Sequence, residues 1–256
     1  MLLPPAPTPT QRAAMRVRPA RTAAMRMAWR DLLFLHWRWD PAEIQARLPA
    51  GLFVDTHDGA AWLGIVPFWM DAVRPSFLPP LPGLSWFLEL NLRTYVYTSD
   101  GTPGVWFFSL DCNQPLAVRI ARGGFSLPYV DAKQQGRRPT PAHPLASFTS
   151  LRAGGTATAL EYEMAGAAFT APPGSLEYFL VERYAFFSTT RRGSLREGRV
   201  WHPPYVVAPA RVPQAEVGMF ADNGLATPTR PADHALVSAG VAIHAYALSP
   251  VVAPRR

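Results

Sequence analysis

The sequence predicts a strand-rich protein of the α+β class with few, short helices. Its 256 residues include 28 prolines and 18 glycines spread between short apolar runs, a pattern that favours strands joined by turns over a helical bundle. The composition, 48% hydrophobic and only 17% charged, is sufficient for a large core. No internal repeat or linker divides the chain, so we expect a single domain over residues 27–250.

The strand predicted over residues 87–97 has one apolar face and one polar face. Side chains in a strand alternate between two faces, so one face carries Leu88, Leu90, Leu92, Thr94 and Val96, and the other carries Glu89, Asn91, Arg93, Tyr95 and Tyr97. The first face belongs to a core. The second places an acid, an amide, a guanidinium and a phenol at a spacing of roughly 7 Å, as in a ligand-facing strand. Alternation alone is equally compatible with an exposed, salt-bridged face.

Before this strand, residues 1–26 are interpreted as a disordered extension, and the ordered chain is expected to begin near Met25. Residues 1–30 contain six arginines and no acid, which faintly resembles an organelle transit peptide and equally suits a disordered leader. The remaining residues hold 19 basic against 18 acidic side chains, so the folded part is nearly neutral. A nucleic-acid-binding surface is therefore not expected. Because no apolar run suits a membrane span or secretory signal, neither is expected.

The other elements follow from periodicity and from capping or turn residues. In chain order we expect a strand at 31–39, a short helix capped by Asp40 and ending at Pro49, an apolar strand at 60–70, and a proline-rich loop at 75–83. After the organising strand come an antiparallel strand at 105–111, a helix from Asn113 to Gly124, a flexible loop at 134–144, a strand at 155–164, a helix from Ser175 to about Arg183, a hairpin of 184–188 with 199–202, and a buried strand at 235–248.

Few residues suggest covalent or metal chemistry. Cys112 is the single cysteine, which rules out an intrachain disulfide and indicates a reducing compartment, so we expect a cytoplasmic protein. Lys133 is the only lysine; it is either a group retained to form a Schiff base or a solvated loop residue. The six histidines show no metal-ligand spacing, and no phosphate or dinucleotide fingerprint occurs. No metal or cofactor is expected.

Several stretches together resemble the YqjF-like family, whose fold is similar to that of acetoacetate decarboxylase. They are Trp29–Trp37, the Asp58-Gly59-x-Ala61-Trp62 turn, Pro67-Phe68, the Glu89-x-Asn91-x-Arg93-Thr94-Tyr95-Val96 strand, Leu127-Pro128-Tyr129 and Glu182-Arg183-Tyr184. The resemblance covers about residues 27–248. It implies curved antiparallel sheets that form a cone or partial barrel around a central pocket.

The same resemblance contains one departure that matters for mechanism. Acetoacetate decarboxylase uses a Schiff-base lysine that follows a proline, together with a glutamate on the preceding long strand. This sequence places Tyr129 and Val130 after Pro128, and Lys133 lies four residues beyond Tyr129, up to roughly 13 Å along an extended chain. The resemblance therefore implies a pocket more strongly than it implies the decarboxylase reaction.

We therefore expect a pocket for a small carboxylate or oxo acid, lined by His36, Asn91 and Tyr95 beside three reactive groups. Arg93 would hold a carboxylate or enolate oxygen, Glu89 would handle a proton, and Tyr129 would donate to a carbonyl. Arg183 and His202 are further candidate ligand-binding residues. The reaction would be of the lyase type: decarboxylation, aldol addition or dehydration. The alternatives are a non-catalytic binding protein and a Schiff-base lyase using Lys133. A homo-oligomer is compatible with the sequence.

Overall fold

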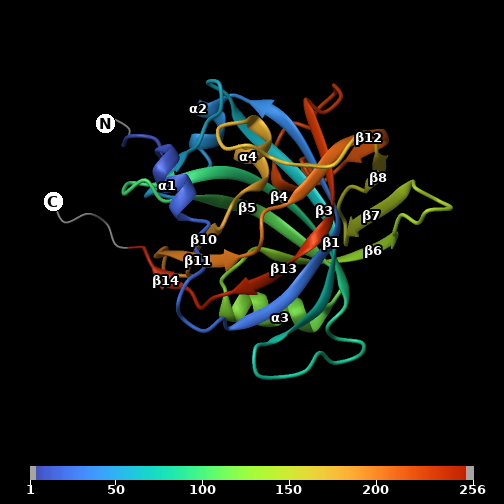
Figure 1. Ribbon diagram of the computed structural model, residues 1–256, viewed down its shortest axis with the longest axis horizontal. Coiled ribbons are helices and arrows are strands. Elements are labelled where there is room, and N and C mark those ends of the chain that lie inside the picture. The colour runs from blue at the N-terminus through green and yellow to red at the C-terminus, as the bar shows by residue number, and fades with distance from the viewer. Residues whose placement is uncertain (1–3, 252–256) are drawn as a thin grey trace.

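The computed structural model describes residues 4–251 and is built mainly of strands that curl around two interiors (Figure 1). This confirms the strand-rich class and the curved sheet. Helices α2 and α4 lie at one end of the molecule and α3 lies at the other, while α1 packs at the side from which the chain begins (Figure 1). Across the described residues, no helix combines the length and the apolar character needed to cross a bilayer.

The elements alternate short helices with strands of up to fifteen residues. In order they are α1 (Pro9–Ala14), β1 (Met25–Trp39), α2 (Pro41–Gln45), β2 (Leu52–Val54), β3 (Ala61–Pro75), β4 (Phe87–Thr98), β5 (Pro103–Cys112), α3 (Pro115–Gly124), β6 (Tyr129–Arg137), β7 (Ala146–Arg152), β8 (Thr158–Met164), β9 (Phe169–Thr170), α4 (Leu176–Val181), β10 (Ala185–Thr189), β11 (Leu195–Trp201), β12 (Val206–Val217), the 3₁₀ turn η1 (Ala221–Asn223), β13 (His234–Ala245) and β14 (Ser249–Pro250).

Strand pairing closes the sheet into two rings that share a wall. The first ring runs β10-β5-β4-β3-β1-β13-β11 and returns to β10. The second ring runs β5-β6-β7-β8-β12-β13 and returns through β1, β3 and β4. Strands β13, β1, β3, β4 and β5 are common to both rings. Most neighbours are antiparallel; β5 is parallel to β6 and to β10.

Strand β4 lies between β3 and β5 in the shared wall and is buried along all twelve of its residues. The side chains of Leu88, Leu90 and Leu92 pack into the core of the second ring. Those of Phe87 and Tyr95 pack into the core of the first ring. The predicted alternation is therefore correct, but neither face of β4 meets solvent. The polar row is enclosed within the first ring.

Part of the second ring was not predicted from the sequence. The loop expected at residues 134–144 is shorter, because β6 continues to Arg137 and β7 begins at Ala146. Strand β6 carries a largely polar sequence because many of its side chains, including Lys133 and Gln135, face outward and are exposed. Its polarity reflects an exposed strand face and not a flexible loop.

Within residues 1–26, for which the sequence predicts a disordered extension, the structure describes a short helix and its contacts with the rest of the chain. From Pro4 onward this segment is described, and α1 begins with a capping box between Thr8 and Gln11. Arg12 makes a bidentate ion pair with the buried Asp55, with both nitrogen–oxygen distances at 2.7 Å. Met15 is buried against Tyr184. The segment folds because its arginine and methionine find buried partners in the domain. Residues 1–3 lie outside the described range.

The substitution Arg12→Ala should destabilise the protein, because it removes one of the two cations that pair with the enclosed Asp55 carboxylate. We expect the free energy of unfolding to fall by about 1–3 kcal/mol, which corresponds to a melting temperature lower by roughly 2–10 °C for a chain of this size. Urea unfolding measures the change in free energy, and thermal unfolding measures the change in melting temperature. The exposed Arg26 provides the matched control, since Arg26→Ala should leave stability nearly unchanged. Equal stability of both variants would contradict the anchoring role of α1.

Candidate active site

A cavity of about 270 Å³ lies inside the first ring, between α4 and α3. This volume is close to the lower end of the roughly 300–1,000 Å³ that small-molecule sites usually occupy. Most of its lining is apolar. The polar side chains that reach it include four of the predicted site residues, Glu89, Arg93, Tyr129 and Arg183. The structure therefore brings part of the predicted set together around one enclosed space.

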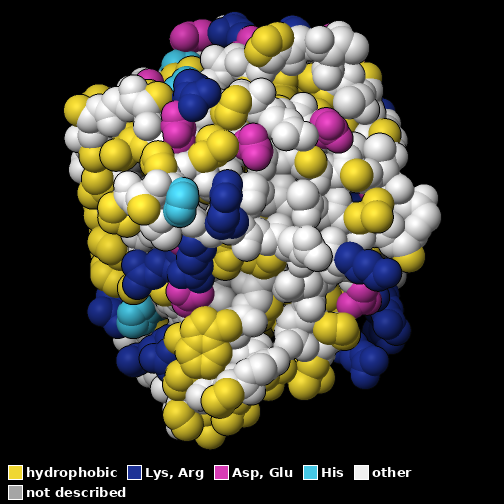
Figure 2. Space-filling model, turned by 90° about the vertical axis from the view of Figure 1, so that its right-hand side faces the viewer, with side chains coloured by type: hydrophobic (Ala, Val, Ile, Leu, Met, Phe, Trp, Pro, Cys, Tyr) yellow, Lys and Arg dark blue, Asp and Glu magenta, His cyan; other side chains and the backbone are white. Residues whose placement is uncertain are grey.

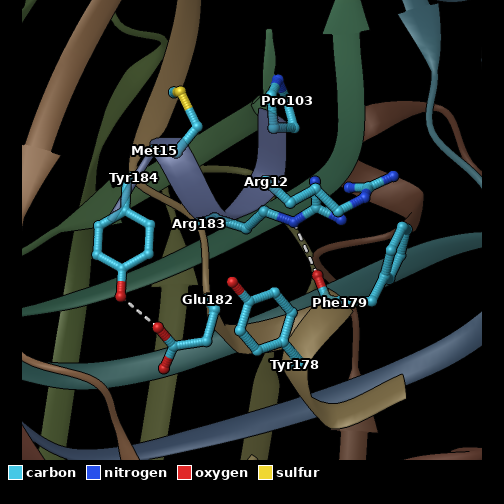
Figure 3. Close-up of a pocket in the computed structure, with 8 residues that line it drawn as sticks. All are labelled: Arg12, Met15, Pro103, Tyr178, Phe179, Glu182, Arg183 and Tyr184. Carbon is cyan, nitrogen blue, oxygen red and sulfur yellow. Dashed lines mark hydrogen bonds between the residues drawn. The ribbon is translucent and has the colours of Figure 1, made fainter. Parts of the chain in front are cut away.

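The cavity is closed at the α4 end and open toward α3. At the closed end, Val181 and Arg183 are buried, and Arg12 of α1 lies beside Arg183 (Figure 3). The remaining void there measures about 10 Å³, which is room for about one water molecule and not for a ligand. At the other end, lining residues are partly exposed, and Ile120 on α3 reaches 54%. A ligand therefore enters beside α3.

Glu89 and Tyr129 form a hydrogen-bonded pair on the cavity wall. The Tyr129 hydroxyl donates to Glu89 Oε2 over 2.7 Å, and both side chains are buried. Burial raises the pKa of Glu89 to about 7, with smaller opposing effects of hydrogen bonding to Tyr129 and Asn91. Burial and the neighbouring carboxylate raise the pKa of Tyr129. A carboxyl group that titrates near neutral pH can both accept and donate a proton there.

Arg93 lies deeper in the cavity, toward α4, and it has no acidic partner among the described residues. One of its terminal nitrogens donates to the Leu180 carbonyl at 3.0 Å and to the Tyr95 hydroxyl at 3.3 Å. Its Nε has no hydrogen-bond partner, and no carboxylate among residues 4–251 lies within 4.0 Å of its nitrogens. The guanidinium instead faces the rings of Phe34 and Tyr95. A buried, unpaired cation of this kind is poised to bind an anion.

Tyr95 and His36, both predicted to bind ligand, lie behind Arg93 and do not line the cavity. The Tyr95 hydroxyl donates to the Leu180 carbonyl at 2.7 Å and lies 2.7 Å from Nε2 of His36. Burial, followed by the charge of Arg93, lowers the pKa of His36 well below its ordinary value. Asn91 is likewise buried outside the lining, with Oδ1 unpartnered. Tyr95, His36 and Asn91 therefore lie outside the cavity, next to the side chains of Arg93 and Glu89.

Arg183 lies at the closed end and forms an ion pair with Asp55, a residue that the sequence analysis missed. Its Nη1 donates to Asp55 Oδ2 at 2.8 Å, and Arg12 pairs with the same carboxylate. Its guanidinium also lies 4.2 Å from the centre of the Phe179 ring. Burial lowers the pKa of Arg183, and Asp55 opposes this effect. The sequence does offer one indication of this ion pair, because Asp55 directly follows the apolar triplet Leu52–Val54. An acid in such a context is expected to be buried, and a buried carboxylate requires cationic partners.

His202 does not reach the cavity. Its ring stacks on Tyr184, with centroids 4.4 Å apart, and Nδ1 lies 2.9 Å from the Pro203 carbonyl oxygen. Burial lowers its pKa. The nearby Glu182 accepts hydrogen bonds from the Tyr184 hydroxyl and from the backbone N–H of Tyr205. This group of residues fixes the path of the chain after α4, which is a structural role.

Lys133 lies outside the cavity that Glu89, Arg93 and Tyr129 line. It is exposed on β6, opposite Leu151 of β7, and it is absent from the lining of the cavity. The strand that places Tyr129 in the cavity carries Lys133 away along the second ring, so the Schiff-base alternative lacks its nucleophile. Cys112 is buried, and burial raises the pKa of its thiol to about 12. Among residues 4–251, no three His, Cys, Asp or Glu side chains converge as metal ligands.

Solved structures define the fold class. An acetoacetate decarboxylase-like enzyme from Sphingomonas wittichii RW1 is similar, with a TM-score of 0.59, 19% identity, and coverage of 91% of this chain and 94% of that one. The enduracididine biosynthesis enzyme MppR has a TM-score of 0.64, 15% identity, and coverage of 95% and 93%. Acetoacetate decarboxylase from Legionella pneumophila has a TM-score of 0.61, 12% identity, and coverage of 93% and 90%. The chain therefore has the acetoacetate decarboxylase-like fold.

Sequence comparison identifies the family within that fold. The chain belongs to the DUF2071 family of uncharacterised conserved proteins, whose model matches residues 26–242. It is 39% identical over 197 residues to the uncharacterised protein YqjF of Bacillus subtilis (strain 168), which covers 76% of this chain and 78% of that protein. The YqjF-like resemblance and the fold it implied are thus confirmed. The N-terminal segment with Arg12 precedes the matched region.

Glu89 should make folding stability depend on pH. Its pKa is about 7 in the folded protein against an ordinary value of 4.5, so the folded state binds more protons between these values. Stability should fall by roughly 3 kcal/mol as pH rises from about 4.5 through 7. Urea unfolding across this range should show that Glu89→Gln removes the decline. The exposed Glu43 provides the control, because Glu43→Gln should retain the decline. Identical pH profiles for wild type and Glu89→Gln would contradict the raised pKa.

Proposed function

We propose that the cavity binds an oxo acid or another small carboxylate, with Arg93 as its counter-ion. The observation that carries this proposal is the unpaired charge of Arg93, which is only 8% exposed and faces an enclosed space without a carboxylate partner. A ligand carboxylate would supply the missing anion and accept charge-assisted hydrogen bonds from the free guanidinium nitrogens. Arg183 contributes less to this binding, because it already forms an ion pair with Asp55.

The proposed chemistry is proton transfer at a carbon beside a carbonyl, in a reaction of the lyase type. In this mechanism the ionised Glu89 takes a proton from the carbon, and Arg93 stabilises the negative charge that develops on the carboxylate or enolate oxygen. Once Glu89 is protonated, the Tyr129 hydroxyl no longer faces a full negative charge and turns to donate to the substrate carbonyl. Aldol addition and dehydration of an oxo acid use such a step. Decarboxylation uses its reverse: loss of CO2 leaves the enolate, and protonated Glu89 then donates its proton to the carbon.

Two features guide the choice of probe compounds. One solved structure of the enzyme MppR, which shares the fold, carries pyruvate. Another carries the condensation product of pyruvate and imidazole 4-carboxaldehyde. Because these proteins are at most 15% identical to this chain, their ligands are starting probes rather than assigned substrates. Pyruvate and acetoacetate are therefore the first compounds to test. We further propose a cytoplasmic location, supported by the single, unpaired cysteine.

A non-catalytic binding protein is the second candidate function. It is favoured by the position of Lys133, since the cavity lacks the nucleophile on which Schiff-base chemistry depends. Both functions require the same carboxylate site. Turnover of a bound oxo acid, followed by nuclear magnetic resonance of the substrate protons, separates them: saturable binding without chemistry across the probe panel supports the binding function.

Arg93→Gln should lose ligand binding while keeping the fold. Acetoacetate at about 100 times its dissociation constant should stabilise wild type by roughly 2.7 kcal/mol, which thermal unfolding registers as a higher melting temperature. The variant should show no such shift. Its ligand-free stability should equal or exceed that of wild type, because a neutral amide replaces a desolvated, unpaired charge. Arg119→Gln on the exposed face of α3 is the control and should respond like wild type. An undiminished response in Arg93→Gln would refute the proposal.

Borohydride reduction in the presence of pyruvate or acetoacetate should leave the protein mass unchanged, since the only lysine is exposed outside the cavity. Peptide mapping then assigns any adduct to a residue. Lys133→Arg should bind both acids as wild type does. A reduced adduct on Lys133, absent from Lys133→Arg, would restore the Schiff-base mechanism and contradict the assignment of chemistry to Glu89 and Tyr129.

A further inference from the structure

We infer that the ligand is an amphipathic acid, with its carboxylate at Arg93 and an apolar chain or ring that extends outward toward α3. This inference rests on the proposed function, because it takes the acid-binding role of Arg93 as given. It adds the chemical class of the rest of the molecule. The distribution of polar and apolar groups along the cavity carries the argument.

The polar groups of the cavity gather on its inner, buried walls. Glu89, Arg93, Tyr129 and Arg183 are all less than one-tenth exposed. Toward the opening, the lining consists of side chains such as Met25, Met27, Val73, Ala117, Ile120 and Phe125, which are half-buried or exposed. Arg74 is the charged residue of this outer part, and it donates to the carbonyl of Ala72 at 2.8 Å. The site therefore offers one charged end and one long apolar end.

A three- or four-carbon acid at Arg93 would leave the outer apolar lining in contact with water. An attached chain would cover it, and each methylene group removed from water should strengthen binding by about threefold to fourfold. Three methionines, Met25, Met27 and Met70, stand along this wall. Their unbranched, polarisable side chains adapt to different apolar shapes, so the outer part suits a linear chain as well as an aromatic ring.

The apolar surface continues beyond the opening. Leu116 and Ile120 on α3 are exposed, as are Phe77, Leu81 and Trp86 in the loop between β3 and β4. Gln114 at the start of α3 donates to the Gly83 carbonyl at 2.9 Å, which holds the loop beside the helix. Figure 2 shows hydrophobic side chains gathered at the lower end of the face it draws, at the height where Figure 1 places this loop. An apolar chain longer than the cavity would therefore meet apolar surface outside it.

Calorimetric titration of the full chain with unbranched saturated monocarboxylates of four, six, eight and ten carbons tests the inference. The dissociation constant should fall by about threefold to fourfold for each added methylene until the chain reaches the opening. Ala117→Phe narrows the outer part of the cavity, so it should weaken octanoate binding at least tenfold and leave butanoate binding unchanged. Arg119→Phe, at an exposed position of α3 outside the cavity, should bind both acids as wild type does.

The outcomes separate this inference from the proposal on which it rests. If butanoate binds wild type as tightly as octanoate and decanoate do, the amphipathic ligand is refuted and the small-acid site stands. If neither these acids nor acetoacetate binds, the proposed function fails, and the inference fails with it. If acetoacetate binds and no saturated acid does, the inference alone is refuted. Primary alcohols of the same lengths test the head group: equal affinity for alcohols and acids would refute the role of Arg93 while the apolar outer site remained. The wild-type series decides these points even if Ala117→Phe fails to fold.

Discussion

The enclosure of β4 within a wall shared by two closed rings is the constraint on which the rest of the structure depends. A strand at the surface of a single sheet would expose alternate side chains to water. Here the leucines of β4 fill one ring, and Glu89 and Arg93 face the interior of the other. Desolvation therefore acts on every polar group of the row, and each group must be paired, hydrogen-bonded or available to a ligand.

The polar residues of the first ring meet this requirement in different ways. Asp55 is paired twice, with Arg12 and Arg183, and this arrangement closes one end of the ring. Glu89 accepts a hydrogen bond from Tyr129 and pairs with no cation among the described residues. Burial therefore raises the pKa of Glu89, because no positive charge opposes the effect. Arg93 is held by neutral oxygens alone. The paired charges around Asp55 stabilise one end of the first ring. The unpaired charge of Arg93, further inside the ring, marks the proposed site.

The sequence was sufficient to predict what local periodicity encodes. The alternation along β4 and the capping residues Asp40 and Ser175 predicted elements that the structure contains, and the motifs around Glu89 and Glu182 predicted the family and its fold. Long-range pairing was not predictable: nothing near Arg12 in the sequence indicates Asp55, and polar β6 resembles a loop until its partners are known. Lys133 and His202 were chosen by residue type, which carries no information about which way a strand or loop directs them.

The opening beside α3 would also constrain the order of events in the proposed reaction. A reactant that occupies Arg93 has to pass the whole apolar passage first, and any second reactant then fills the space behind it. If the proposed reaction joins two molecules, the acid would have to bind first, and the joined product would leave with its outer half foremost. An excess of the second reactant would obstruct entry of the acid, so substrate inhibition by that partner follows from the architecture of the ring.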